Sequence, residues 1–338
     1  MRYELRFWEE SLTPVDIARK GLPYLQAYRA GVAAAVYPTS LTRRNANAIR
    51  KLKEAGVEVA LWPLMEKEHG YFPGERNAPG YAAFVRFILD WAEKNRALPD
   101  IIAIDLEMPV QQITRVVSAR NPWLKLLGIY TSARENLDRE RYYRAKARLA
   151  DLNSEIQDRG VRTLAAVVPW VGLELETEHE LLQDMTETPA SGIGWDIISP
   201  MLYVSMLEGM SSGAITRKDA NWLVYDSCRK LRDKFGGRTG VSLGLTGGGV
   251  LESEPVFGSP AQLLTGIEAA LAAGVRDITI YSLEGILSRD DPGEWFEAIR
   301  RARASVPERS RKVADGLAAA RRIYPRIARL VDWYRRPP

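Results

Sequence analysis

The 338-residue sequence is poor in cysteine and histidine, which excludes several kinds of active site. The single cysteine, Cys228, cannot form an internal disulfide, and its place in a helical run suggests a small core residue. Two histidines, His69 and His179, are too few for the multi-histidine centre of a metal-dependent hydrolase. No Gly-x-Ser-x-Gly motif points to a serine nucleophile. We therefore expect no cofactor and no transition metal, while an oxygen-ligated Mg²⁺ or Ca²⁺ site stays open.

Long apolar runs and a dominant sign of charge are also missing. No stretch reaches the length of a membrane span. The 47 basic and 43 acidic residues are spread along the chain, and the one dense basic stretch, 300–322, is typical of a solvated helix face. We expect neither nucleic acid nor a membrane span. The sequence starts in a strand-like run without a signal segment, so the compartment stays open between the cytoplasm and secretion with the signal absent from this sequence. The oligomeric state stays open.

What the sequence does contain is a regular alternation of short β-rich runs and amphipathic helical runs. Several helical runs end in glycine directly before a β-branched or apolar run, as at Ala30-Gly31, Ala55-Gly56, Gly160 and Ala273-Gly274. No glycine-rich phosphate turn follows the first run, which disfavours an open doubly wound sheet. Eight strands are predicted, at residues 3–9, 33–38, 57–64, 101–107, 163–170, 197–203, 240–246 and 277–282.

This pattern predicts a single (β/α)8 TIM barrel. Residues 1–305 would form the barrel as a catalytic domain. Residues 306–338 would form a C-terminal helical extension packed on its outside. The predicted loops after strands three, five and six are long and lie at the carboxyl ends of the strands, where barrel enzymes build their active sites.

Two carboxylates stand at the end of the fourth predicted strand. Period-two alternation turns Ala103, Asp105 and Glu107 toward the barrel interior. Two buried like charges raise the pKa of at least one of them, as a general acid near neutral pH requires. A structural alternative is that Arg6 or Arg162 neutralises both acids.

The fourth strand resembles that of the chitinase-like, family 18 glycoside hydrolases. Asp100, Asp105 and Glu107 match three of the four acids of that family's motif, and Ala103 stands at the remaining position. The family's Ser-x-Gly-Gly motif on strand three has no counterpart. A short Asp-x-Glu on a strand also occurs in lysozyme-like family 25 barrels.

Strands six and eight add to the resemblance. Met201-Leu-Tyr203 is similar to the family's Met-x-Tyr-Asp, with Val204 in place of the aspartate. Thr279-Ile-Tyr281 stands where the family commonly has Met-x-Trp.

The resemblance implies a glycosidase that cleaves a polysaccharide or oligosaccharide. Glu107 would be the general acid/base, Asp105 would orient the substrate's own 2-acetamido group, and Tyr203 would hydrogen-bond the developing oxazolinium. A substrate without an N-acetyl group would need a protein nucleophile, and Glu9 and Glu284 are the candidates.

A carbohydrate cleft is further indicated by aromatic residues near predicted strand ends, although such rings also cap barrel cores. Two other functions stay open. One is a carbohydrate-binding pseudoenzyme, and the other is a non-glycosidic barrel with a divalent metal, which needs more acids around Asp105. The expected substrate-binding residues are Glu9, Trp62, Tyr71, Trp170, Met201, Tyr281 and Glu284.

Overall fold

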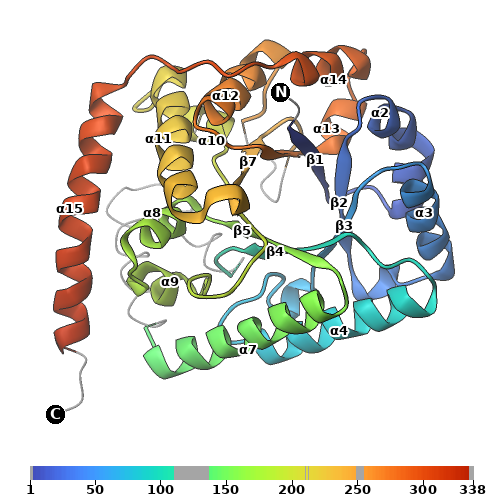
Figure 1. Cartoon of the computed structure of the whole chain (residues 1–338), viewed down its shortest axis with the longest axis horizontal. Coiled ribbons are helices and arrows are strands. Elements are labelled where there is room, and N and C mark those ends of the chain that lie inside the picture. The colour runs from blue at the N-terminus through green and yellow to red at the C-terminus, as the bar shows by residue number, and fades with distance from the viewer. Residues whose placement is uncertain (1–2, 110–136, 210, 212, 249–254, 335–338) are drawn as a thin grey trace.

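A computed structural model describes residues 3–109, 137–209, 211, 213–248 and 255–334, and its central element is an eight-stranded parallel sheet (Figure 1). The strand order is β6-β5-β4-β3-β2-β1-β8-β7. Two parallel bridges, Ile198–Thr239 and Met201–Ser242, join β6 to β7 and nearly close the sheet into a ring. The predicted TIM-barrel fold is confirmed.

All eight predicted strands are present, and each observed end lies within three residues of the predicted one. Five of the eight are entirely buried, as expected of parallel strands covered by helices. The strands are β1 (Glu4–Glu9), β2 (Gly31–Val36), β3 (Val59–Pro63), β4 (Ile101–Leu106), β5 (Arg162–Val167), β6 (Ile197–Pro200), β7 (Gly240–Gly244) and β8 (Asp277–Tyr281).

Helices cover the outside of the barrel. Thr42, Asp138 and Thr216 cap three of the long helices by accepting a backbone N–H in the first turn. The longer helices are α3 (Arg43–Glu54), α4 (Ala78–Lys94), α7 (Arg139–Asp158), α11 (Arg217–Phe235), α12 (Pro260–Ala272), α14 (Pro292–Arg301) and α15 (Arg311–Tyr334). The short ones are α1 (Pro14–Asp16), η1 (Ile17–Gly21), α2 (Leu22–Ala27), η2 (Pro38–Ser40), η3 (Lys67–His69), α8 (Pro169–Thr177), α9 (Leu181–Thr186), α10 (Val204–Gly209), η4 (Gly236–Arg238) and α13 (Leu283–Leu287).

Three of the four predicted glycine joints are observed as such. Gly56, Gly160 and Gly274 adopt positive φ directly after a helix, where a side chain would be strained. At the first joint the structure differs, because Arg29 takes the left-handed conformation, with φ of 51°, and Gly31 begins β2. A Cβ on Gly31 would lie 2.8 Å from the carbonyl oxygen of Glu58. This glycine therefore allows the start of β2 to lie close to the backbone just before β3.

Alternation along β1 separates the inner from the outer face of the barrel. Phe7 points outward, and its ring centroid lies 5.0 Å from that of Phe296 on α14. Trp8 points inward, and its indole N–H donates to Ser242 on β7 at 3.1 Å. Arg6 therefore also points inward, and the residue after the strand, Glu10, continues this inner row.

The amino end of the barrel is closed by paired charges. The guanidinium of Arg6, which is 1% exposed, donates to Glu58 at 3.0 Å and to Asp277 at 3.2 Å. Arg162 also pairs with Glu58. Burial opposes the charge of Arg6, but Asp277 and Glu58 outweigh it and keep the pKa of Arg6 above its ordinary value.

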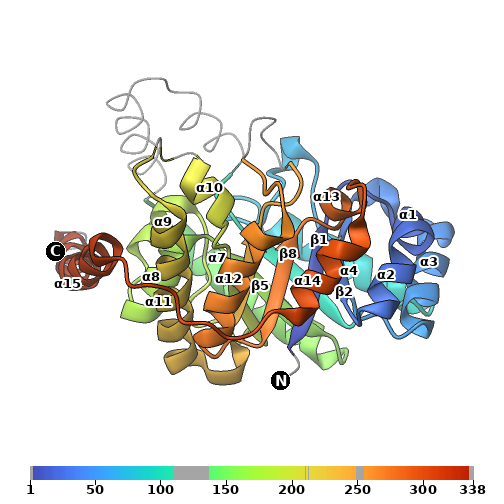
Figure 2. The ribbon, with the colours of Figure 1, turned by 90° about the horizontal axis from the view of Figure 1, so that it is seen from above.

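The C-terminal helix α15 lies along the outside of the barrel, beside α8 and α11 (Figures 1 and 2). Arg321 on α15 pairs with Glu176 on α8 at 2.7 Å and with Asp226 on α11 at 2.6 Å. The segment 302–310 is not helical, so the extension begins as extended chain, and 335–338 lie outside the described residues. The domain boundary at 305/306 stays a prediction. In the part of the chain that the structure describes, no helix combines the length and apolar character of a membrane span.

Candidate active site

Asp105 is a buried acid at the carboxyl end of the barrel, which we call the barrel mouth. It lies on the inner face of β4, is 5% exposed, and its Oδ1 has no hydrogen-bond partner in the described structure. Burial first, and then the charges of Glu107 and Glu10, raise the pKa of Asp105 well above its ordinary value. The protonated form of Asp105 is therefore favoured relative to an exposed aspartate.

Glu10, directly after β1, is a second acid of the mouth that the sequence reasoning missed. Its Oε1 accepts a hydrogen bond from the hydroxyl of Tyr71, and its Oε2 accepts one from Tyr281 at 2.7 Å. The Tyr37 hydroxyl lies 3.0 Å from that of Tyr71. Since the one Tyr71 proton goes to Glu10, Tyr37 is the donor in that second contact.

The tyrosines of the mouth come from several different segments of the chain. Tyr71 lies in the β3–α4 connection, Tyr281 ends β8, and Tyr203 follows β6. The Tyr203 and Tyr281 rings are 6.2 Å apart, and Tyr71 and Tyr281 are largely buried. The structure thus brings together Asp105, Tyr71, Tyr203 and Tyr281 of the predicted site around Glu10.

Glu9 has a different environment from Glu10. Its side chain is fully buried, and the carboxylate accepts backbone N–H groups from Ser11 at 2.8 Å, Leu12 at 2.7 Å and Glu284 at 2.7 Å. Burial is the main reason that its pKa rises to about 7. The two predicted nucleophile candidates, Glu9 and Glu284, thus contact each other at the joint between β1 and α13.

Below the acids, two tryptophans fill the barrel. Trp62 on β3 is 3% exposed, and its ring centroid lies 4.9 Å from that of Trp8 in an edge-on arrangement. The Trp62 indole N–H has no hydrogen-bond partner in the described structure. Met201 is buried beside β7, where its bridge to Ser242 helps to close the ring.

Trp170 does not end the fifth strand as predicted. That strand stops at Val167, and Trp170 lies in the first turn of α8, where it is 37% exposed. Its indole N–H donates to Thr186 on α9 at 3.4 Å. The segment predicted as a long loop, 171–194, contains α8 and α9, because the buried Glu174 accepts the N–H groups of Leu182 and Gln183 and so fixes the start of α9.

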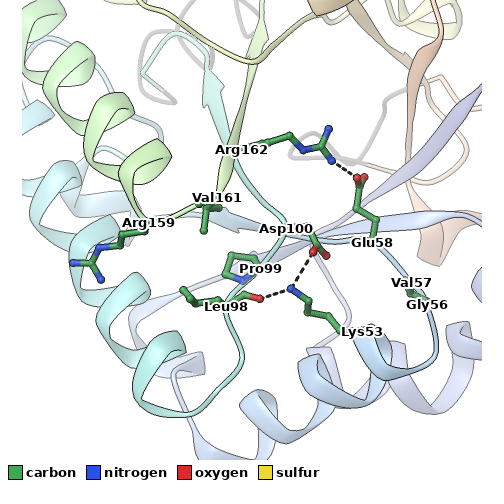
Figure 3. Close-up of a pocket in the computed structure, with 11 residues that line it drawn as sticks. Lys53, Gly56, Val57, Glu58, Leu98, Pro99, Asp100, Arg159, Val161 and Arg162 are labelled. Atoms are coloured by element: carbon green, nitrogen blue, oxygen red, sulfur yellow. Dashed lines mark hydrogen bonds and ion pairs between the residues drawn. The ribbon is translucent and has the colours of Figure 1, made fainter.

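The structural alternative, in which Arg6 or Arg162 neutralises the acids of β4, is wrong. Arg6 and Arg162 lie at the opposite end of the barrel and pair with Glu58, so they do not neutralise Asp105. Figure 3 shows this amino end, where Arg162, Glu58, Lys53 and Asp100 line an open depression of about 690 Å³.

The charges of that depression are mutually satisfied. Lys53 pairs with Asp100 at 2.9 Å and donates to the Leu98 carbonyl, and Arg159 pairs with Asp90 at 2.7 Å. Because barrel enzymes place their chemistry at the carboxyl end, we assign this depression a structural role. Asp100, matched to the chitinase-like motif, also accepts the N–H of Val59 at 2.9 Å and so serves the amino end.

Glu10, Asp105 and Glu107 do not form a close ligand set for a metal ion. Among the described residues, one group of three acid or histidine side chains has all its ligand atoms within 4.8 Å of one another. It consists of the exposed Glu66, Glu68 and His69 around η3.

The alternation of inward and outward side chains along β1 is the sequence signal that identifies Glu10. Leu5, Phe7 and Glu9 share the outer face of the strand, so the inner row of Arg6 and Trp8 continues to Glu10. The contacts of Glu10 with Tyr71 and Tyr281 join residues 61 and 271 positions apart. No local pattern predicts such pairs.

Comparison with known proteins shows the fold and no family. No protein-family model and no curated protein matches the sequence. The structure is similar to the glycoside hydrolase domain of PgaB (BpsB) from Bordetella bronchiseptica, with a TM-score of 0.51 and 10% identity over 89% of this chain and 99% of that one. It is also similar to an endo-β-1,4-mannanase from Thermotoga petrophila, with a TM-score of 0.52 and 11% identity over 89% and 76% of the two chains.

A family GH113 β-1,4-mannanase gives a TM-score of 0.50 at 12% identity, over 89% of this chain and 98% of that one. An L-ribulose 3-epimerase also resembles the chain, at 14% identity and a TM-score of 0.46. At such identities the likeness shows the TIM-barrel fold alone.

Proposed function

We propose that the protein is a glycoside hydrolase that cleaves a polysaccharide or oligosaccharide, with Glu107 as its general acid/base. The observation that best supports the proposal is the clustering of acids from two strands at the barrel mouth. Asp105 on β4 is influenced by the charges of both Glu107 and Glu10, and tyrosines from three further segments surround them. Acids clustered at this end of a barrel are costly to bury and favour a catalytic role.

Asp105 and Glu107 then have separate tasks. Glu107 protonates the glycosidic oxygen as the bond to the leaving sugar breaks. Asp105 lies two residues earlier on the same inner row, and burial and the neighbouring acids raise its pKa. This favours the protonated carboxyl, which can both donate and accept a hydrogen bond.

The group that acts at the anomeric carbon has two possible sources. The chitinase-like resemblance implies the substrate's own 2-acetamido group, oriented by Asp105, with Tyr203 hydrogen-bonded to the oxazolinium. A carboxylate of the protein is the other source. The two routes differ in whether an N-acetyl group on the sugar is required.

The carbohydrate would contact the inner wall of the mouth. Trp62 offers a buried N–H without a partner in the described structure, and Tyr71 and Tyr281 present hydroxyls. Met201 closes the wall on the β6 side. Glu9, Glu284 and Trp170 stay predicted substrate contacts.

The test is a reducing-end release screen over chitin oligomers, peptidoglycan, and uronic-acid, galactosamine and neutral glucans. Glu107→Gln should lower activity on the cleaved polymer by about 10² to 10⁴-fold, because a neutral amide donates no acid proton. Asp105→Asn should also lower it. Glu54→Gln on α3 is a matched control, since Glu54 is exposed and lies outside the mouth.

A second candidate is a carbohydrate-binding barrel without turnover. Two motif positions that hold acids in the chitinase-like enzymes are apolar here, and both Ala103 and Val204 are buried, at 0% and 2% exposure. Glycan binding without release of reducing ends, unaffected by Glu107→Gln, would favour this function.

A further inference from the structure

Glu10 is the acid of the mouth for which the proposed function has not yet assigned a task. It lies directly after β1, while Asp105 and Glu107 lie on or just after β4. In the strand order, β1 and β4 are separated by β2 and β3, so they belong to different walls of the eight-stranded ring. Asp105 and Glu107 share one strand and cannot lie on two sides of a sugar. Glu10 and Glu107 come from different walls of the barrel and can lie on two sides of a sugar.

The two tyrosines hold the Glu10 carboxyl group in one position. Tyr71 donates a hydrogen bond to one oxygen of the Glu10 carboxyl group and Tyr281 donates to the other. The Tyr37 hydroxyl in turn donates to the hydroxyl of Tyr71. Both donors are largely buried, at 5% and 8% exposure, so their rings are fixed by packing. Each oxygen of a carboxylate has two lone pairs, so one hydrogen bond to each leaves Glu10 able to bond to carbon.

The charge of Glu10 also acts on Asp105. It is one of the two charges that act on Asp105, the other being Glu107. Asp105 is therefore close enough to both glutamates for their charges to act on it. Phenol hydroxyls stabilise a carboxylate without cancelling its charge, which stays available to a positively charged transition state.

We propose that Glu10 is the catalytic nucleophile of the hydrolysis, facing Glu107 across the bound sugar. The inference rests on the proposed function and deepens it. A Glu10 oxygen bonds to the anomeric carbon while the bond to the leaving oxygen breaks and Glu107 gives that oxygen its proton. Water then attacks the same carbon, gives a proton to Glu107 and releases Glu10 with its electron pair. A 2-acetamido group on the substrate is not required.

The first test needs no variant. The wild-type protein is incubated with 2-deoxy-2-fluoro glycosides, with an activated leaving group, of the sugar class that the screen identifies. A nucleophile traps such a sugar as a stable ester. Tryptic cleavage after Arg6 and Arg19 gives the peptide 7–19, which contains Glu9 and Glu10, and fragmentation assigns the added mass to one of them. We expect it on Glu10, and a label on another residue overturns the inference.

The second test compares variants on the cleaved polymer. Glu10→Gln should lower kcat at least about 100-fold, while Glu54→Gln leaves it unchanged. Azide should restore turnover to Glu10→Ala and give a glycosyl azide, which a merely structural role of Glu10 would not allow. Trapping of the wild type keeps the inference falsifiable if Glu10→Ala does not fold.

The outcomes separate this inference from the proposed function. Loss of activity in Glu107→Gln with full activity in Glu10→Gln overturns the role of Glu10 alone. Strict dependence on a 2-acetamido group, with no label on Glu10, does the same and supports substrate assistance. A wild type that cleaves none of the polymers overturns the glycosidase proposal, and the role of Glu10 with it.

Discussion

Arg6→Met tests whether the charges at the amino end of the barrel are structural and independent of the acids at the mouth. Arg6 is 1% exposed and donates to Glu58, Asp277 and Thr279. Methionine fills much of the arginine stem's volume but supplies no charge or donor. The change leaves Asp277, 13% exposed, without its partner in the described structure, while Glu58 keeps Arg162.

The expected loss in the free energy of unfolding is about 3 kcal/mol at pH 7. Removing one member of a buried ion pair costs roughly 3 to 5 kcal/mol, because the remaining charge is left uncompensated. The lower end applies here, since Glu58 is 28% exposed and has a second cation. Burial raises the pKa of Glu58, but the charge and hydrogen bond of Arg6 outweigh it, so the pKa is lowered overall.

The sign of the pH dependence follows from that lowered pKa. Stability that Glu58 gains from Arg6 is present above its ordinary pKa of 4.5 and is lost as the pH falls through the folded value. The difference between wild type and Arg6→Met should therefore shrink below about pH 4.5. Urea unfolding at pH 7 and pH 4 measures it.

The control is the double variant Arg6→Met with Asp277→Asn, which should recover part of the loss because no uncompensated aspartate remains. Turnover per folded molecule, on whichever polymer is cleaved, should not change. A loss below about 0.5 kcal/mol, typical of a surface substitution, would refute the assignment of Arg6 as a buried structural cation. A loss of activity without loss of stability would refute the independence of the two ends.

Three further predictions concern other parts of the molecule. Burial, with the charges of nearby acids, raises the pKa of Glu75 to about 8 although Arg141 opposes this, so its stabilising contribution is full below pH 4.5 and lost as the pH rises through 8. Glu75→Gln should therefore weaken the fall in unfolding free energy between pH 5 and pH 9, measured with urea. Phe296→Ala removes a fully buried ring that packs on Phe7 and should cost roughly 3 to 5 kcal/mol in the same assay. Tyr281→Phe removes a donor to Glu10 and should lower kcat about tenfold with the unfolding free energy changed by less than about 1 kcal/mol.

The barrel was predictable because each of its units is specified locally. The alternation of β-rich and helical runs set the eight strands, and Gly56, Gly160 and Gly274 marked the turns between helix and strand. Period two along β4 was enough to identify Asp105 as an inward acid, since it is buried at the mouth and affected by Glu107. These inferences need only neighbours a few residues apart in sequence.

The site was less predictable because its contacts join distant segments. The sequence reasoning chose Glu9 as the acid at the end of β1, although Phe7 at the same parity contacts the outer helix α14. Applying alternation to β1 as it was applied to β4 would have selected Glu10. The fixing of Glu10 by Tyr71 could not be predicted, because the position of Tyr71 depends on the fold of the whole β3–α4 connection.

The two ends of the barrel compensate negative charge in different ways, and this difference bears on function. At the amino end, Glu58 and Asp277 face the guanidinium of Arg6, so negative charge meets positive charge and its external field is small. At the mouth, both oxygens of Glu10 accept hydrogen bonds from tyrosine hydroxyls, which fix the carboxyl group in position. An acid that only held the fold together would be stabilised best by the first arrangement. The second fixes an acid by hydrogen bonds from tyrosines, which fits the proposed reaction through a cationic sugar.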